Sequence, residues 1–170
     1  AAGLTVAGDI DIDGTSNLDI VDVDGAVNFA ADVTFADGAD IITASAGTSN
    51  VRVGVNAGNS IASGGIYNVL VGDEAGTAIT TGDQNVAIGY EALKTEDTGS
   101  RNTAVGAYTL NVLNNDALSY NTAIGYASGL SVTTGIENTL IGGLAGDAIT
   151  TGAENVAVGA SALSANTTAN

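Results

Sequence analysis

The chain has 170 residues, with 19 acidic side chains against 3 basic ones, and it contains no Cys, His, Met, Trp or Pro. Its formal net charge of −16 repels phosphate backbones and anionic membrane surfaces, which argues against nucleic-acid binding, and the lack of Cys excludes a disulfide scaffold. No apolar run approaches the roughly 18 residues of a membrane-spanning helix, so we expect no membrane insertion.

Residues 1–49 differ in character from the remainder of the chain. The first forty residues hold nine Asp and neither Lys nor Arg. Their apolar alternation is interrupted by Asp-Gly pairs at 13–14, 24–25 and 37–38. Asp-Gly is a turn signal that suits β-hairpins, and the spacing of the pairs also suits short stacked coils, which we prefer. We therefore predict an Asp-rich β segment at 1–49 that forms a shaft or a junction.

The start of this segment contains a pattern that is typical of calcium loops. Asp9, Asp11, Asp13 and Gly14 follow the order D-x-D-x-D-G. A complete loop needs a bidentate Glu at its twelfth position, where this chain has Ile20. In a strand, Asp at every second position simply marks the solvated face. We therefore expect no cofactor, and calcium at Asp9, Asp11 and Asp13 remains the alternative.

A five-residue motif, Asn-[Val/Thr]-x-[Val/Ile]-Gly, recurs seven times from residue 50 onward, at intervals of 17 to 19 residues. Its Asn residues are Asn50, Asn68, Asn85, Asn102, Asn121, Asn138 and Asn155. Its Gly residues are Gly54, Gly72, Gly89, Gly106, Gly125, Gly142 and Gly159. A unit of 17 residues is too short for two helices and lacks the 3.6-residue apolar spacing of a helix.

The repeat predicts an all-β fold. We expect residues 50–163 to form a parallel β-solenoid, or β-roll, of seven coils of about 17 residues, with equivalent strands stacked ~4.8 Å apart. Within the third copy, Val86 and Ile88 point to one side and Ala87 to the other. Arg52 holds the place of Ala87 in the first copy, which suggests that this middle position is not deeply buried, at least in the first coil. Residues 164–170 have no obvious cap, so we expect a continuation of the chain or the end of a fragment.

The recurring Asn and Gly predict structural roles. Each Asn side chain is expected to bond the next coil or its corner backbone, forming a ladder, whereas a row of ligand-binding side chains is the alternative. Each motif Gly is expected at a corner that needs a positive φ or a close approach of two backbones.

The composition also argues against catalysis. Without His or Cys, and with a single Lys, the chain has no evident means of activating a nucleophile. Paired carboxylates could cleave glycosides, but the acids of the repeats fall mostly at variable positions beside corners, as solvated charges do. We therefore expect that the protein is not an enzyme.

The repeats "TGDQNVAIGYEAL" and "TGIENTLIGGLAG" resemble the head repeats of trimeric autotransporter adhesins. They are still more similar to repeats common in bacteriophage tail fibres, where the Asn-Thr-Ala-Ile-Gly form predominates. The resemblance covers about residues 50–163. In the adhesins this motif forms a left-handed parallel β-roll in which three chains pack side by side, so the resemblance implies a homotrimer. The units here are longer than the usual adhesin unit.

The resemblance implies a structural fibre protein of a phage tail fibre or similar appendage, located in the virion. Its partners would be further copies of itself, as a homotrimer or a longer fibre, and a host-surface glycan or protein reached through the coil loops. One alternative is the head domain of a trimeric autotransporter adhesin on a bacterial surface. A second alternative is a glycan-cleaving, tailspike-like β-helix.

Overall fold

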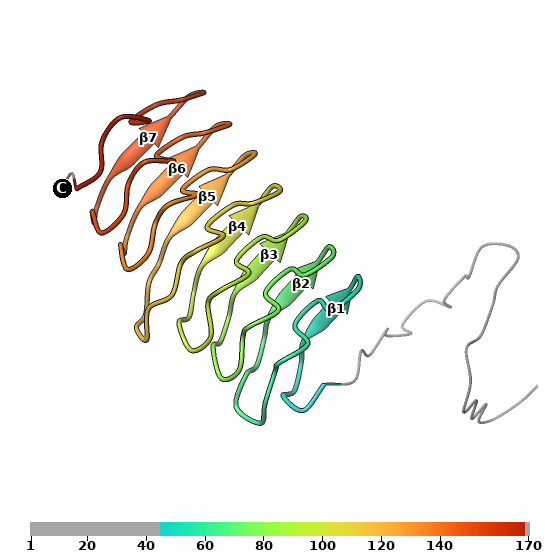
Figure 1. The fold of residues 1–170 in the computed structure, drawn as a ribbon. Helices are drawn as coiled ribbons and strands as arrows, with labels where there is room; N and C mark the ends of the chain where they lie inside the picture. The colour runs from blue at the N-terminus through green and yellow to red at the C-terminus, as the bar shows by residue number, and fades with distance from the viewer. Residues whose placement is uncertain (1–44, 169–170) are drawn as a thin grey trace, which may run out of the picture. The chain divides into compact units, whose positions relative to one another are not determined.

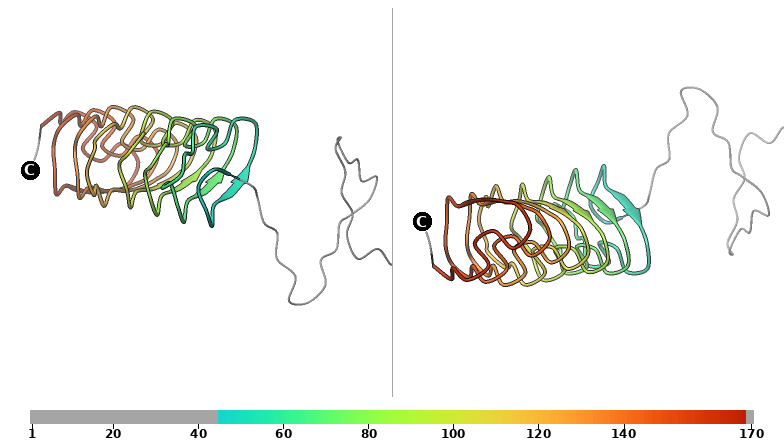
Figure 2. Two further views of the ribbon diagram at one scale, coloured as in Figure 1. Left: turned by 90° about the horizontal axis from the view of Figure 1, so that it is seen from below. Right: turned by 90° about the horizontal axis from the view of Figure 1, so that it is seen from above.

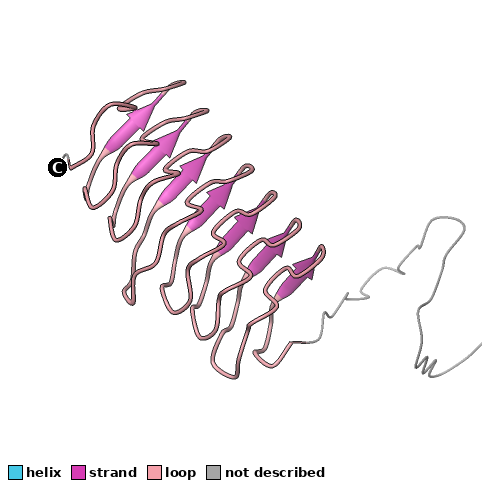
Figure 3. Ribbon diagram, in the orientation of Figure 1, coloured by secondary structure: helices cyan, strands magenta, loops and turns pink. Residues whose placement is uncertain are grey.

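A computed structural model describes residues 45–168, which form a parallel β-solenoid without any helix in that range (Figure 1). Each coil is numbered by its one short strand, and turns make up the remainder of the coil (Figure 3). The strands are β1 (Val51–Val53), β2 (Val69–Val71), β3 (Val86–Ile88), β4 (Thr103–Val105), β5 (Thr122–Ile124), β6 (Thr139–Ile141) and β7 (Val156–Val158). The predicted fold class is therefore confirmed.

The strands form one parallel sheet in sequence order, and Figure 2 shows the coils stacked one on the next. Equivalent residues of successive coils are paired. Between β2 and β3, for example, Leu70 pairs with Ala87 and Val71 pairs with Ile88. Backbone hydrogen bonds tie each coil to the next, as from Val86 N to Asn102 O at 2.8 Å. The predicted shaft at 1–49 and the calcium alternative at Asp9, Asp11 and Asp13 lie outside the described residues, apart from 45–49.

The middle residue of each strand faces the interior of the solenoid. Leu70, Ala87, Ala104, Ala123 and Leu140 are fully buried, and Ala157 is nearly so. The sequence-based inference that this position is shallow is therefore wrong beyond the first coil. Arg52 is half-buried and its Nε donates a hydrogen bond to Ala57 O at 2.6 Å. A long side chain can cover the core with its aliphatic stem while its polar head is bonded, so Arg is tolerated at this position.

In most coils, two positions six residues apart share the same interior volume, whereas in coil 5 both are small, Ala123 and Gly129, and leucines of the adjacent coils fill the space. In coil 2, a Cβ placed on Gly76 would lie 2.7 Å from Leu70 Cδ2, so the large strand residue fills the space beside the glycine. In coil 3 the sizes are reversed, because the strand residue is Ala87 and the residue six places later is the fully buried Leu93. Close packing at a fixed coil width accounts for this exchange of volume.

Candidate functional site

The described residues contain no pocket. No group of three or more His, Cys, Asp or Glu side chains within 45–168 is placed to hold a metal ion. The same residues include no helix long and apolar enough to cross a membrane. The candidate sites are therefore the interior ladder and the outer faces of the solenoid.

All seven motif Asn side chains are buried and linked from coil to coil. Asn85 shows the repeating pattern: its backbone N–H donates to Asn68 Oδ1 at 2.9 Å, and its Nδ2 donates to Gly99 O at 2.9 Å. Its own Oδ1 accepts a hydrogen bond from the backbone N–H of Asn102 at 3.0 Å. Both ends of the side-chain amide are thus used inside the solenoid, which gives the ladder a structural role.

The longest hydrogen bond of the ladder joins Asn102 to Asn121. The backbone N–H of Asn121 lies 3.4 Å from Asn102 Oδ1, whereas the equivalent bonds between other coils measure 2.8–3.1 Å. Coil 4 is two residues longer than the common unit, and Leu118 stands where most coils have the Gly that precedes the next Asn by three residues. The irregular sequence of coil 4 therefore coincides with the weakest part of the ladder.

The motif Gly residues lie at corners with φ between 125° and 134°. A Cβ on Gly72 would lie 2.5 Å from Gly89 O, because the corner of the next coil stacks directly against it. Both a positive φ and a close backbone approach thus favour glycine here. At Gly159, in the last coil, no atom lies within 4 Å of such a Cβ.

The first and third residues of every strand point away from the interior and together form one surface, which we call the outer strand face. It consists of Val51, Val53, Val69, Val71, Val86, Ile88, Thr103, Val105, Thr122, Ile124, Thr139, Ile141, Val156 and Val158. Every member is Val, Ile or Thr, and several are substantially exposed, such as Ile124 at 39 %. The outer strand face is thus uncharged and rich in Val and Ile on a chain of net charge −16, which makes it a candidate contact surface.

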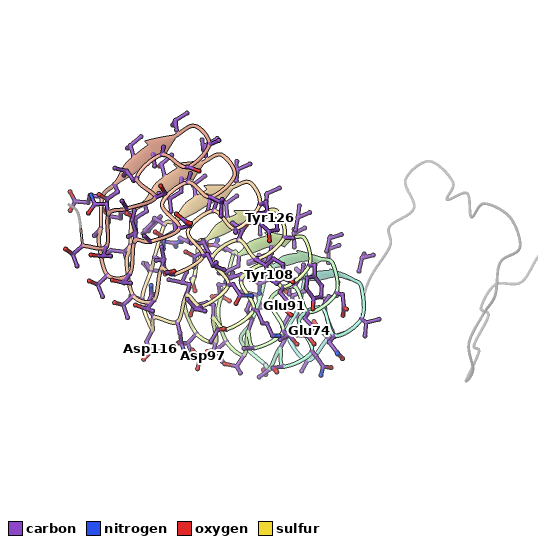
Figure 4. All side chains as sticks on the ribbon, turned by 45° about the horizontal axis from the view of Figure 1, so that its top comes forward. Glu74, Glu91, Asp97, Tyr108, Asp116 and Tyr126 are labelled. Atoms are coloured by element: carbon purple, nitrogen blue, oxygen red, sulfur yellow. The ribbon has the colours of Figure 1, made fainter. Side chains whose placement is uncertain are left out.

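A row of aromatic side chains follows the strands of the central coils. Tyr90 and Tyr108 have ring centroids 5.3 Å apart, and Tyr108 and Tyr126 are 6.0 Å apart, both pairs in edge-to-face geometry. Figure 4 shows Tyr126 and Tyr108 along one edge of the stack, with Glu91 beyond them. A hydrogen bond to Glu91 raises the pKa of Tyr90 to about 12 and lowers the pKa of the Glu91 carboxyl.

Two ion pairs of Lys94 lie beside this row. Lys94 Nζ is 2.5 Å from Glu74 Oε2 and 3.2 Å from Glu91 Oε1. All three side chains are partly exposed, so these contacts contribute little to stability. Bonds to the two carboxylates raise the pKa of Lys94.

One carboxyl lies inside the core and was missed by the sequence analysis. Glu96 is fully buried, and burial raises its pKa to about 7. It stands twelfth in its unit, where coils 2 and 4 have Ile79 and Leu113. That alignment was the signal that could have identified it, because a single acid in an otherwise apolar column of a repeat is exceptional.

Comparisons of this chain with protein-family models, with curated proteins and with solved structures found no match. The case for a function therefore comes from the repeat and from the surfaces that it builds.

Proposed function

We propose that this chain is a structural, non-enzymatic segment of a phage tail fibre or a similar surface appendage, in which three copies pack side by side through the outer strand face. The observation that carries the proposal is the partly exposed, uncharged Val/Ile/Thr surface of all seven strands. The proposal needs no metal or cofactor.

A stacked solenoid suits a supporting role because its stability comes from neighbouring coils. A single coil buries only a few aliphatic side chains, worth roughly 1.5–3 kcal/mol each. Ordering 17 residues costs on the order of 1–2 kcal/mol apiece in backbone entropy. Each coil therefore depends on the coils above and below, and the result is an extended element rather than a site built around a cavity.

A second copy of the chain is the partner that best fits the outer strand face. The face repeats at the spacing of the sheet, ~4.8 Å, and another ladder with the same spacing can match it along its whole length. The 19 acids of each copy repel those of another, so copies can approach closely only where acids are absent. The outer strand face has no charged member.

The native mass of the full chain, measured by analytical ultracentrifugation at two concentrations, tests this proposal. We expect a mass of three chains for the parent protein. Ile124→Glu places a charge on the outer strand face and should reduce the mass to one chain while the circular dichroism of the solenoid is retained. Thr151→Glu adds the same charge at an exposed turn and should leave the mass at three chains.

A parent protein with the mass of a single chain would refute side-by-side packing. An Ile124→Glu variant that keeps the mass of three chains would show that the copies meet through a different surface.

Attachment to a host-surface glycan or protein through the coil loops is a second proposed role, favoured by the row of Tyr90, Tyr108 and Tyr126, in which Tyr90 and Tyr126 are exposed and Tyr108 is half-buried. Tyrosine presents an apolar ring together with a hydroxyl and is common where proteins contact partners. The β-solenoid is equally compatible with the alternative of a bacterial adhesin head, and the glycan-cleaving, tailspike-like β-helix is the second alternative. The absence of a pocket among the described residues gives the cleaving alternative no support.

A further inference from the structure

A buried carboxyl interrupts an apolar column that runs along the interior of the solenoid. The column consists of the twelfth residue of each of the first six coils, which are Ile61, Ile79, Glu96, Leu113, Val132 and Ile149. Glu96 is fully buried. Its Oε1 accepts a hydrogen bond from Gly99 N at 2.8 Å, and its Oε2 accepts one from Asn115 N at 3.3 Å. These bonds attach the carboxyl to its own coil and to coil 4.

Glu96 is contacted by an irregular segment of coil 4, the longest of the repeat units. Residues 114–119 include the two-residue extension of this coil. Asn115 Oδ1 accepts a hydrogen bond from Ser119 Oγ at 2.7 Å, whereas Asn115 Nδ2 is buried without a hydrogen-bond partner. A buried donor without a partner costs about 1–3 kcal/mol, so this segment has less to lose by opening than a regular coil does.

Asp97 is the charge that acts on Glu96, and it further raises the pKa of the buried carboxyl, while the other acids nearby belong to the adjoining coils. Asp97 follows Glu96 in coil 3, and Asp116 of coil 4 accepts a hydrogen bond from Thr98 Oγ1 at 2.7 Å. In coil 2, the Gly82 N–H donates a hydrogen bond to Asp97 O, and the next residue in the chain is the acid Asp83. The neighbouring bases are bonded elsewhere, Lys94 to Glu74 and Glu91 and Arg101 to Gln84.

We propose that the junction between coils 3 and 4 is a pH-dependent weak point of the solenoid, closed while Glu96 is protonated and opened at residues 114–119 when Glu96 ionises. A neutral carboxyl can occupy an apolar column, whereas a carboxylate there lacks a counter-charge and draws water. Opening of the covering segment supplies that water while the remaining coils stay stacked.

The direction of the effect follows from the pKa of Glu96 in the two states. In the closed state burial outweighs the Gly99 and Asn115 N–H bonds, which lower this pKa, and raises it from 4.5 to about 7; exposure on opening returns it to its ordinary value. The closed state is therefore fully favoured below pH 4.5 and loses stability as the pH rises toward about 7. Over this window the opening constant should rise by up to about tenfold per pH unit.

Hydrogen exchange measured by NMR between about pH 5 and 8, corrected for intrinsic exchange, tests the proposal directly. The Gly99 and Asn115 amides, which donate to Glu96, should lose protection as the pH rises. The Gly129 amide, which donates to Ala145 O in the regular part of the stack, should not. An equal loss at Gly129 would assign the effect to general repulsion among the acids and would overturn the proposal.

Three variants separate Glu96 from its surroundings. Glu96→Gln keeps the shape but cannot ionise, so the protection of the Asn115 amide should become independent of pH. Glu96→Leu restores the apolar column and should give the same result, which keeps the test decisive if the Gln variant folds poorly. Asp116→Asn removes an exposed carboxylate from the same segment and should leave the pH dependence of the parent intact. A pH dependence that persists in both Glu96 variants would overturn the proposal.

Discussion

Replacing Asn85 by alanine tests the ladder that joins the coils. The change removes the donor to Gly99 O and the acceptor for Asn102 N–H, which are bonded at 2.9 Å and 3.0 Å. Both groups lie inside the stack, where water cannot easily replace the lost partner. Each unsatisfied group costs about 1–3 kcal/mol, so Asn85→Ala should lower the free energy of unfolding by about 2–6 kcal/mol.

Urea unfolding followed by circular dichroism measures this loss, at one fixed protein concentration because association adds to apparent stability. Asn114→Ala is the matched control, since it makes the same chemical change at an exposed position of the neighbouring coil. We expect the control to change the free energy of unfolding by less than about 0.5 kcal/mol. Equal losses in the two variants would refute the argument that the ladder carries stability through satisfied buried amides.

Two further predictions concern the corners and the core. Gly72→Ala should lower the melting temperature as strongly as a severe core mutation, because φ is 133° and the new Cβ would meet Gly89 O at 2.5 Å. Gly143→Ala is the control, because the space around Gly143 is open, and it should leave the melting temperature nearly unchanged. Leu70→Ala should cost about 2–5 kcal/mol. Adding Gly76→Leu should recover much of that loss in a double-mutant cycle, because coil 3 already uses the reversed pair of sizes, and strictly additive losses would contradict shared volume.

The coil length and the strand register follow from the sequence because the Asn-to-Gly motif repeats at nearly constant spacing. Each motif can be stacked on the next in only one way that aligns every alternating residue. The side of the strand that faces the interior does not follow so easily. Alternation separates Ala87 from Val86 and Ile88, but it does not say which side is inside. The charge of Arg52 suggested that the middle strand position is shallow, which is wrong for the later coils. Arg52 can occupy this position because its guanidinium bonds to Ala57 O beside the core.

The pattern that decides the inward side joins two positions six residues apart. Leu70 is matched by Gly76, and Ala87 is matched by Leu93, so the two sizes vary together in most coils; coil 5, with Ala123 and Gly129, is the exception. This relation is visible in the letters once the copies are aligned, and it needs no structure to be used.

Backbone conformation is harder to predict. Gln84, just before its motif Asn, has φ of 57°, a region that such a residue seldom adopts by its own preference. Its N–H donates to Ile66 O at 3.0 Å, and contacts of this kind with the adjacent coil hold it there. The conformation is thus set by stacking, which no single copy of the repeat contains.

The equal register between successive strands also means that the number of repeat units sets the length of the solenoid. Val69 pairs with Val86 in the same way that Val86 pairs with Thr103, so an inserted or deleted unit would meet neighbours that present the same hydrogen-bonding groups. Duplication of whole units in the gene would therefore change the reach of the protein in steps of ~4.8 Å, without a new fold and without a new set of contacts.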